Sequence, residues 1–177
     1  MDDGFSHDSD FLVWTERQAR ALRALAPRRA DLPNELDLEN LAEEIEDLGR
    51  SEFNSVKSHL RNIMLHLIKS ACAPGAPAIP HWSAESRAFH RSLLDKFSPS
   101  MRTRLDLRSL WSDAREDALD DLLEFGRAPP PGLPVDCPWT LDDFTRGKLD
   151  FPALLARLSA PAKPVKHRRI RLKSSGR

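Results

Sequence analysis

The sequence predicts an all-α protein, a four-helix bundle-like domain with a short C-terminal helical lid and a basic tail. Apolar residues recur at spacings of three and four along four long segments, which is the period of an amphipathic helix. Clusters of proline and glycine separate these segments, and none alternates apolar and polar residues as a strand does. The chain has 177 residues, 40% of them hydrophobic, which is enough for one domain with a core.

The first helix is predicted from Ser9 or Asp10 to Ala26, where Pro27 ends it. Its inward residues are expected at spacings of three and four. They are Phe11, Trp14, Gln18, Ala21 and Leu25.

The second helix is long and begins after Pro33, with Asn34 or Asp37 as its cap. It ends before the segment ACAPGAPAIP, because prolines cannot continue a helix. A period of 3.6 places its apolar residues in a sector of roughly 120°, expected to face the core. These residues are Leu38, Leu41, Ile45, Leu48, Val56, Leu60, Ile63 and Leu67. Gly49 lies on the same side, where its missing side chain would let a neighbouring helix approach closely.

A third helix is predicted over residues 82–97, and Ser98 and Pro99 have the pattern of a cap and first position for a fourth. The fourth helix is expected to reach Phe125 and to end at Gly126. The inward residues expected in the third helix are Trp82, Ser86, Phe89, Leu93 and Phe97, and those in the fourth are Leu107, Trp111, Ala114, Ala118 and Leu122.

Short helices over residues 140–144 and 152–158 are expected to form the lid. We expect one helical domain over residues 1–160 and a flexible basic tail over residues 161–177. The last fifteen residues hold seven Lys or Arg and no acid, whereas the rest of the chain holds 20 basic and 27 acidic residues. Such a tail can bind phosphates of nucleic acid, a protein partner or its own acidic body. The residues predicted to make this contact are Lys166, Arg168, Arg169, Arg171 and Lys173.

Glu52, His59 and His66 follow one another at seven-residue steps on the inward side of the second helix. One interpretation is a buried hydrogen-bond network, completed by Ser55 and Asn62 and by arginines of other helices. The other is a metal or acid–base site. Seven residues span about 10.5 Å along a helix, whereas two ligands of one zinc ion lie within about 4 Å of each other. Each ligand would therefore need a partner from the third helix, such as Glu85, His81 or His90.

Several function classes lack their motifs. The sequence has no glycine-rich phosphate loop and no GxSxG, and Cys72 and Cys137 lie outside any Cys/His cluster, so both are expected to be free thiols. No apolar run approaches the roughly 18 residues of a membrane span, and no signal peptide is evident, so we expect a cytoplasmic protein without a membrane role.

The function expected from these observations is an interaction or regulatory module that binds a protein partner or associates with itself, with nucleic acid as a further partner of the tail. The alternative is a metal-assisted hydrolase that uses Glu52 and His66. No cofactor is expected apart from the divalent transition metal of that alternative.

A family resemblance rests on five separated strings that occur in the right order: DFLVWTERQARALR, LDLENLAEEIEDLGRSE, SHLRNIMLHLIK, FSPSMR and CPWTLDD. Together they resemble bacterial proteins of the domain-of-unknown-function family twenty-nine, over about Asp10 to Phe151. The resemblance implies an all-helical fold and no assigned activity. It also implies that His59 and His90 depart from the family pattern, where arginine is expected. The residues that match the pattern are Glu43, Glu44, Gly49, Glu52 and His66.

Overall fold

The computed structural model describes residues 6–27, 32–124 and 132–159, and every regular element within them is helical. The predicted all-α class is therefore confirmed. The elements are α1 (Phe11–Leu25), α2 (Leu38–Cys72), α3 (Ile79–Lys96), the 3₁₀ helix η2 (Pro99–Thr103), α4 (Leu107–Glu124), α5 (Asp142–Thr145) and α6 (Phe151–Ser159).

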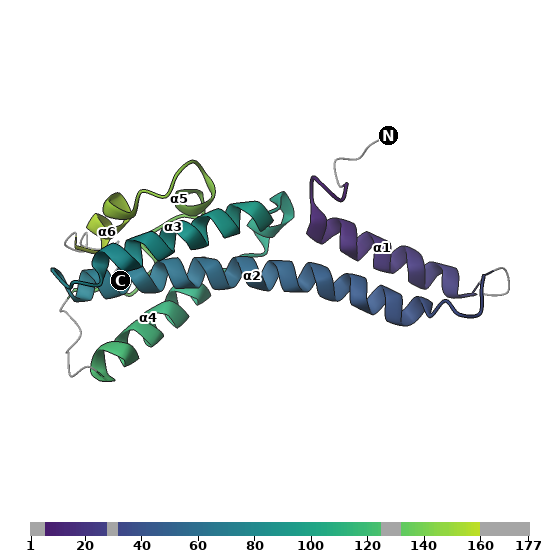
Figure 1. Ribbon diagram of the computed structural model, residues 1–177, viewed down its shortest axis with the longest axis horizontal. Helices are drawn as coiled ribbons and strands as arrows, with labels where there is room; N and C mark the ends of the chain where they lie inside the picture. The colour runs from purple at the N-terminus through teal and green to yellow at the C-terminus, as the bar shows by residue number, and fades with distance from the viewer. Residues whose placement is uncertain (1–5, 28–31, 125–131, 160–177) are drawn as a thin grey trace, which may run out of the picture.

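The long helix α2 is the spine of the molecule (Figure 1). Its N-terminal half pairs with α1 alone and projects as a two-helix arm, here α1 with residues 38–50. Its C-terminal half packs against α3, α4 and α6, which form with it and α5 the body of the molecule. The four long helices thus do not run side by side around one common core, as a simple bundle would have them.

The seam between α1 and α2 is lined by small residues. Ala19 on α1 and Ala42 on α2 are fully buried, and Gly49 faces Thr15. The predicted inward face of α1 is wrong, because Leu12, Thr15 and Ala19 are its buried residues and Gln18, Ala21 and Leu25 are exposed. The prediction placed the largest apolar residues of α1 against α2. Closely spaced helices instead bury small side chains at their contact.

The predicted apolar stripe of α2 is buried only in part. Val56, Leu60, Ile63 and Leu67 belong to the core of the body. Leu41 and Leu48 do not, because their side chains are 41% and 55% exposed. The prediction that these two leucines face the core is wrong.

The body core lies between α2, α3, α4 and the C-terminal helices. Two tryptophans fix the C-terminal segment, since Trp111 Nε1 donates to the Val135 carbonyl at 2.9 Å and Trp139 Nε1 donates to the Leu154 carbonyl at 3.2 Å. Phe144 of α5 packs edge-on against Trp139. The two short C-terminal helices expected as a lid are therefore present and close the core.

Several helix boundaries differ from expectation. Helix α3 starts at Ile79 rather than Trp82, with Pro80 in its first turn, where the missing amide hydrogen costs nothing. Pro99 opens the separate helix η2, and α4 starts at Leu107, where the Asp106 carboxylate accepts backbone amides of the first turn. The predicted end at Phe125 and Gly126 lies outside the described residues.

Among the described residues no helix is both long and apolar enough to cross a lipid bilayer. Cys72 and Cys137 are free thiols, as predicted. Burial raises the pKa of both thiols above its usual range, so both are protonated at neutral pH.

Candidate functional site

The histidines predicted on α2 face α3, where they stack on aromatic rings. His66 lies between Trp82 and Phe89, with ring centroids 6.4 and 5.9 Å away and the planes nearly parallel. His59 stacks on the same Phe89 at 5.8 Å. Trp82 and Phe89 are seven residues apart on α3, so both present their rings to the histidine face of α2.

Glu85 lies between these aromatic residues on α3 and joins two histidines. Its Oε2 atom is 3.1 Å from Nε2 of His66 and 3.3 Å from Nε2 of His81, one turn earlier on α3. His66 is buried and His81 is exposed. The carboxylate therefore connects a buried imidazole with one at the surface.

Burial lowers the pKa of His66, and the positive charge of Lys69 lowers it further, although the Glu85 carboxylate opposes this shift. His66 is therefore neutral at neutral pH, with its Nε2 beside the Glu85 carboxylate. Its Nδ1 is buried and has no hydrogen-bond partner among the described residues. The site thus holds one buried imidazole nitrogen without a hydrogen-bond partner among the described residues, beside two aromatic rings.

Glu52 and His59 have other neighbours. Glu52 lies 3.5 Å from the Lys96 ammonium at the end of α3, and Nε2 of His59 lies 3.4 Å from the Ser55 hydroxyl. Burial and the nearby Lys96 charge lower the pKa of His59. The polar residues predicted to form one network are therefore divided into local pairs along α2.

Of the third-helix partners proposed from the sequence, Glu85 joins His66 whereas His90 does not. His90 lies on another face of α3, buried, with a backbone hydrogen bond to Phe144 of α5. Within the described ranges no three His, Cys, Asp or Glu side chains come close enough to hold one metal ion. The structure brings together only His66 and Glu85, with His81, and metal binding stays a prediction.

Sequence reasoning missed two surface features. One is the exposed pair Leu41 and Leu48, which it assigned to the core. The other is a cavity of about 440 Å³ between the α2–α3 turn and the end of α4, lined by Trp82 and Leu122 among others. No sequence signal marks the cavity, because it depends on how α4 docks. The predicted tail contacts Lys166, Arg168, Arg169, Arg171 and Lys173 lie outside the described residues.

The family model "Domain of unknown function DUF29" matches residues 6–148. The chain belongs to the DUF29 family. The resemblance stated from five sequence strings is thereby confirmed.

A solved structure supports the same assignment for this DUF29 protein. The chain is similar to an alpha-helical protein of unknown function from Rhodospirillum rubrum, with 40% sequence identity and a TM-score of 0.81. The match covers 86% of this chain and 97% of the other. No curated protein matches the chain. The relatives therefore support the fold and add no activity to it.

Proposed function

We propose that this DUF29 protein is a cytoplasmic interaction module, and that its arm binds an amphipathic helix of a partner protein. The observation that carries the proposal is the exposure of Leu41 and Leu48 on α2. Leucines seven residues apart lie on one side of a helix, and such a stripe is what a partner helix contacts. Ile45, half-buried between them, continues the stripe.

The stripe continues the face that α3 covers in the body. Leu41 and Leu48 lie 18 residues, or about five helical turns, before His59 and His66, so they point in the same direction around α2, and those histidines contact α3. Helix α3 ends at Lys96, which reaches Glu52. On the N-terminal side of Glu52, α1 covers only the neighbouring side of α2. The stripe with Leu41 and Leu48 therefore stays exposed to solvent. A helix-wide surface therefore remains along the arm.

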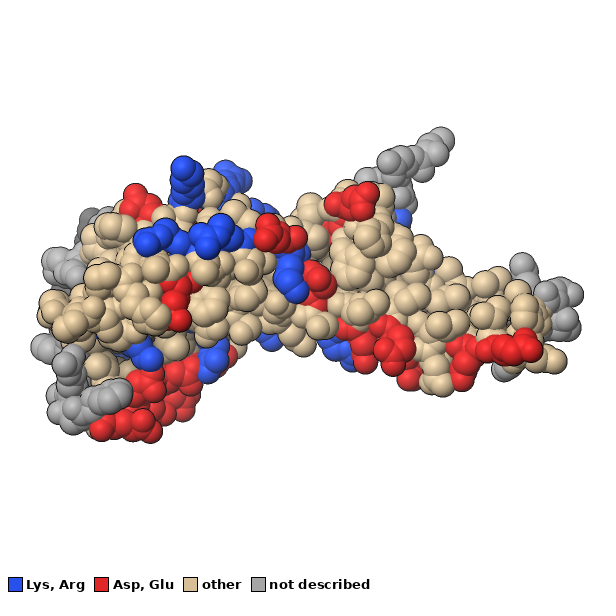
Figure 2. Space-filling view, viewed as in Figure 1, with Lys and Arg blue, Asp and Glu red and all other residues tan. Residues whose placement is uncertain are grey.

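Charges beside the stripe define the chemistry of the partner. Glu44 is exposed one turn before Leu48, beside the stripe. Glu43 and Asp47 are exposed farther round this half of α2, where Asp47 pairs with Arg50, and Figure 2 shows carboxylates along the lower edge of the arm. A partner helix that has an apolar stripe with Lys and Arg beside it complements this surface. A second copy of the arm would bring like charges together, so we favour a basic partner over self-association.

The proposal is tested with a photoreactive amino acid at position 48 of the full chain, in the cells that naturally express it. We expect one protein to be crosslinked, through a peptide with apolar residues at helical spacing and basic residues beside them. The matched control carries the probe at Leu123, which is 60% exposed on α4. No adduct at position 48, or the same adduct at both positions, contradicts the proposal.

A further inference from the structure

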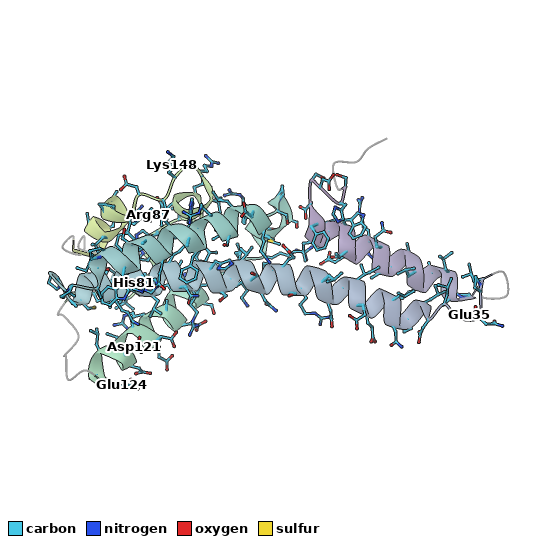
Figure 3. All side chains as sticks on the ribbon, viewed as in Figure 1. Glu35, His81, Arg87, Asp121, Glu124 and Lys148 are labelled. Carbon is cyan, nitrogen blue, oxygen red and sulfur yellow. The ribbon has the colours of Figure 1, made fainter. Side chains whose placement is uncertain are left out.

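An apolar pocket lies at the end of the body farthest from the arm. It has a volume of about 440 Å³ and is lined by the α2–α3 turn (Ala73, Ala76), by Trp82 of α3 and by Leu122 of α4. Lys69 and Asp121 form an ion pair that also lines the pocket. Figure 3 labels His81 on α3 and Asp121 on α4, two of the helices that border the pocket. The volume is sufficient for one or two aliphatic side chains of a bound segment.

The outer face of α4 beside this pocket is strongly acidic. Asp113, Glu116, Asp120 and Glu124 are exposed at spacings of three and four, and none forms an ion pair with a described residue. Figure 2 shows a dense group of carboxylates over α4. Like charges at these spacings repel one another. A cationic segment that neutralises them would lower the free energy of the protein.

The chain itself contains a segment of the complementary composition. Residues 163–177 read KPVKHRRIRLKSSGR, with seven basic side chains, no acid and the aliphatic residues Val165, Ile170 and Leu172 between them. Helix α6 ends at Ser159 and packs against the same half of α2 as α4 does. The 18 residues that follow can extend to about 60 Å, whereas α4 is about 27 Å long. The segment can therefore reach both the pocket and the acidic face.

We propose that residues 163–177 bind the chain's own α4, with an aliphatic side chain in the pocket beside Trp82 and Leu122. The Lys and Arg side chains pair with Glu116, Asp120 and Glu124. The acidic body and the basic tail thus neutralise each other within one molecule. This inference concerns a surface remote from the arm and does not depend on the function proposed for the arm.

Partial trypsin digestion of the full-length protein tests the proposal, with cleavage at the basic residues of the tail from Lys166 onward followed by intact mass, since Lys163 precedes a proline and resists trypsin. The triple variant Glu116→Gln, Asp120→Asn, Glu124→Gln should release the tail. We expect its cleavage to be about tenfold faster than in the wild type, because cleavage tracks the population of the released segment. Ala76→Gln, which places a polar side chain in the pocket without removing a packed one, should also accelerate cleavage.

The matched control changes three carboxylates on the arm, Glu43→Gln, Glu44→Gln and Asp47→Asn, and should leave the cleavage rate unchanged. Equal acceleration in both triple variants, or none in the α4 variant, overturns the proposal. Fast wild-type cleavage that slows only with duplex DNA also overturns it, in favour of nucleic acid as the ligand of the tail. Circular dichroism confirms that each variant is folded.

Zero-length carbodiimide crosslinking gives an independent readout, because it joins lysines to carboxylates in contact. We expect Lys166 or Lys173 to be joined to Asp120 or Glu124 within one chain. Mixing isotopically labelled and unlabelled protein distinguishes bonds within one chain from bonds between two. Crosslinks found only between chains, or only to the arm, contradict intramolecular binding. The Leu48→Ser variant should give the wild-type crosslinks, which separates this test from that of the arm.

Discussion

Gly49 determines how closely α1 can approach α2. A Cβ atom at this position would meet the Thr15 hydroxyl oxygen well inside contact distance and would lie 3.1 Å from the Thr15 Cβ. Thr15 cannot easily turn away, because it is buried and its hydroxyl donates to the Leu12 carbonyl at 2.8 Å. The sequence alone predicted a close approach at this glycine, and the structure identifies Thr15 as the residue that approaches.

Gly49→Ala should therefore destabilise the protein, although alanine is the better helix former. We expect a net loss of up to about 2 kcal/mol, since overpacking costs roughly 1–3 kcal/mol and helix propensity returns about 1 kcal/mol. Urea unfolding measures this loss. Ser51→Ala, at an exposed position of the same helix, is the control and should be neutral or stabilising. Partial rescue by Thr15→Ala would identify the clash as the cause.

His66 makes stability depend on pH. Burial holds its folded-state pKa below the ordinary 6.5, so the unfolded chain binds a proton that the folded chain does not. The stability that this difference supplies is complete above pH 6.5 and is lost as the pH falls toward the folded-state pKa. We expect the free energy of unfolding to decrease between pH 7 and pH 5.

His66→Gln removes this titration and should make the pH profile flatter, although the variant is less stable at pH 7. The profile is measured by chemical denaturation at several pH values. His59 and His90, whose pKa values are also lowered by burial, maintain part of the slope. Ser51→Ala, at an exposed position of α2 with no titratable group, is the control and should leave the slope of the wild type. An unchanged slope in His66→Gln would contradict the assignment.

At the scale of single residues, helical spacing predicted part of the site. The period of α2 placed Glu52, His59 and His66 on one side, and the third-helix partner Glu85 was named in advance. The same period could not distinguish Leu48 from Leu60, because both fit one stripe. Whether a leucine of this stripe is buried depends on how far α3 extends along α2. Helix α3 ends beside Glu52, so it covers Leu60 but not Leu48.

The start of α1 is a polar link between the arm and the rest of the molecule, as is the ion pair of Glu16 with Arg104. Asp10 caps the helix by accepting the Val13 amide, and its carboxylate also accepts the amide and the hydroxyl of Ser100 in η2. These hydrogen bonds lower the pKa of Asp10 even though burial opposes the shift. One side chain therefore ends a helix and joins two elements that are 90 positions apart.

Asp10→Ala should lower the free energy of unfolding by about 2 to 4 kcal/mol, because a helix cap and the charged hydrogen bonds to Ser100 are lost together. Asp37→Ala is the comparison. Asp37 caps α2 through the Asn40 amide and is exposed, so its loss should cost only about 1 kcal/mol. Thermal unfolding of both variants measures the difference. Equal losses would show that the link to η2 adds nothing.

At the scale of the elements, the helices were predictable because each has a repeated apolar pattern between prolines and glycines. The exact starts of the helices, which depend on contacts between side chains and backbone, were not predictable. Ser98 and Pro99 have the pattern of a helix start, and the chain does turn there, but only into η2. Asp106 then caps a new helix eight residues later.

At the scale of the whole molecule, the arm and the body differ in buried apolar contact. Among the residues of the core cluster, Leu12 alone belongs to the arm, and all others lie at Val56 or beyond. A helix pair with one buried side opens at lower free energy than a helix surrounded by others.

Native-state hydrogen exchange should therefore show two levels of protection. We expect amides of residues 12–25 and 41–49 to exchange through a partial opening, and amides of residues 57–68 only through global unfolding. Mild denaturant should separate the two levels. A single common free energy would mean that arm and body unfold as one unit.

The overall shape was the least predictable feature. Four amphipathic helices of ordinary pattern suggested one bundle, whereas α2 is 35 residues long and α3 and α4 have 18 each. A helix about twice as long as its neighbours must extend past them. The expected length of the second helix already implied this mismatch, but the pattern did not indicate which end would project.

The continuity of α2 fixes a distance as well as a fold. The exposed leucines centre on Ile45, and the apolar pocket begins at Lys69 on the same uninterrupted helix. Twenty-four residues separate them, which corresponds to about 36 Å along the axis. Because a packed helix is stiff, whatever binds at each end is held at constant separation and rotation. The molecule therefore has the geometry of a rigid spacer.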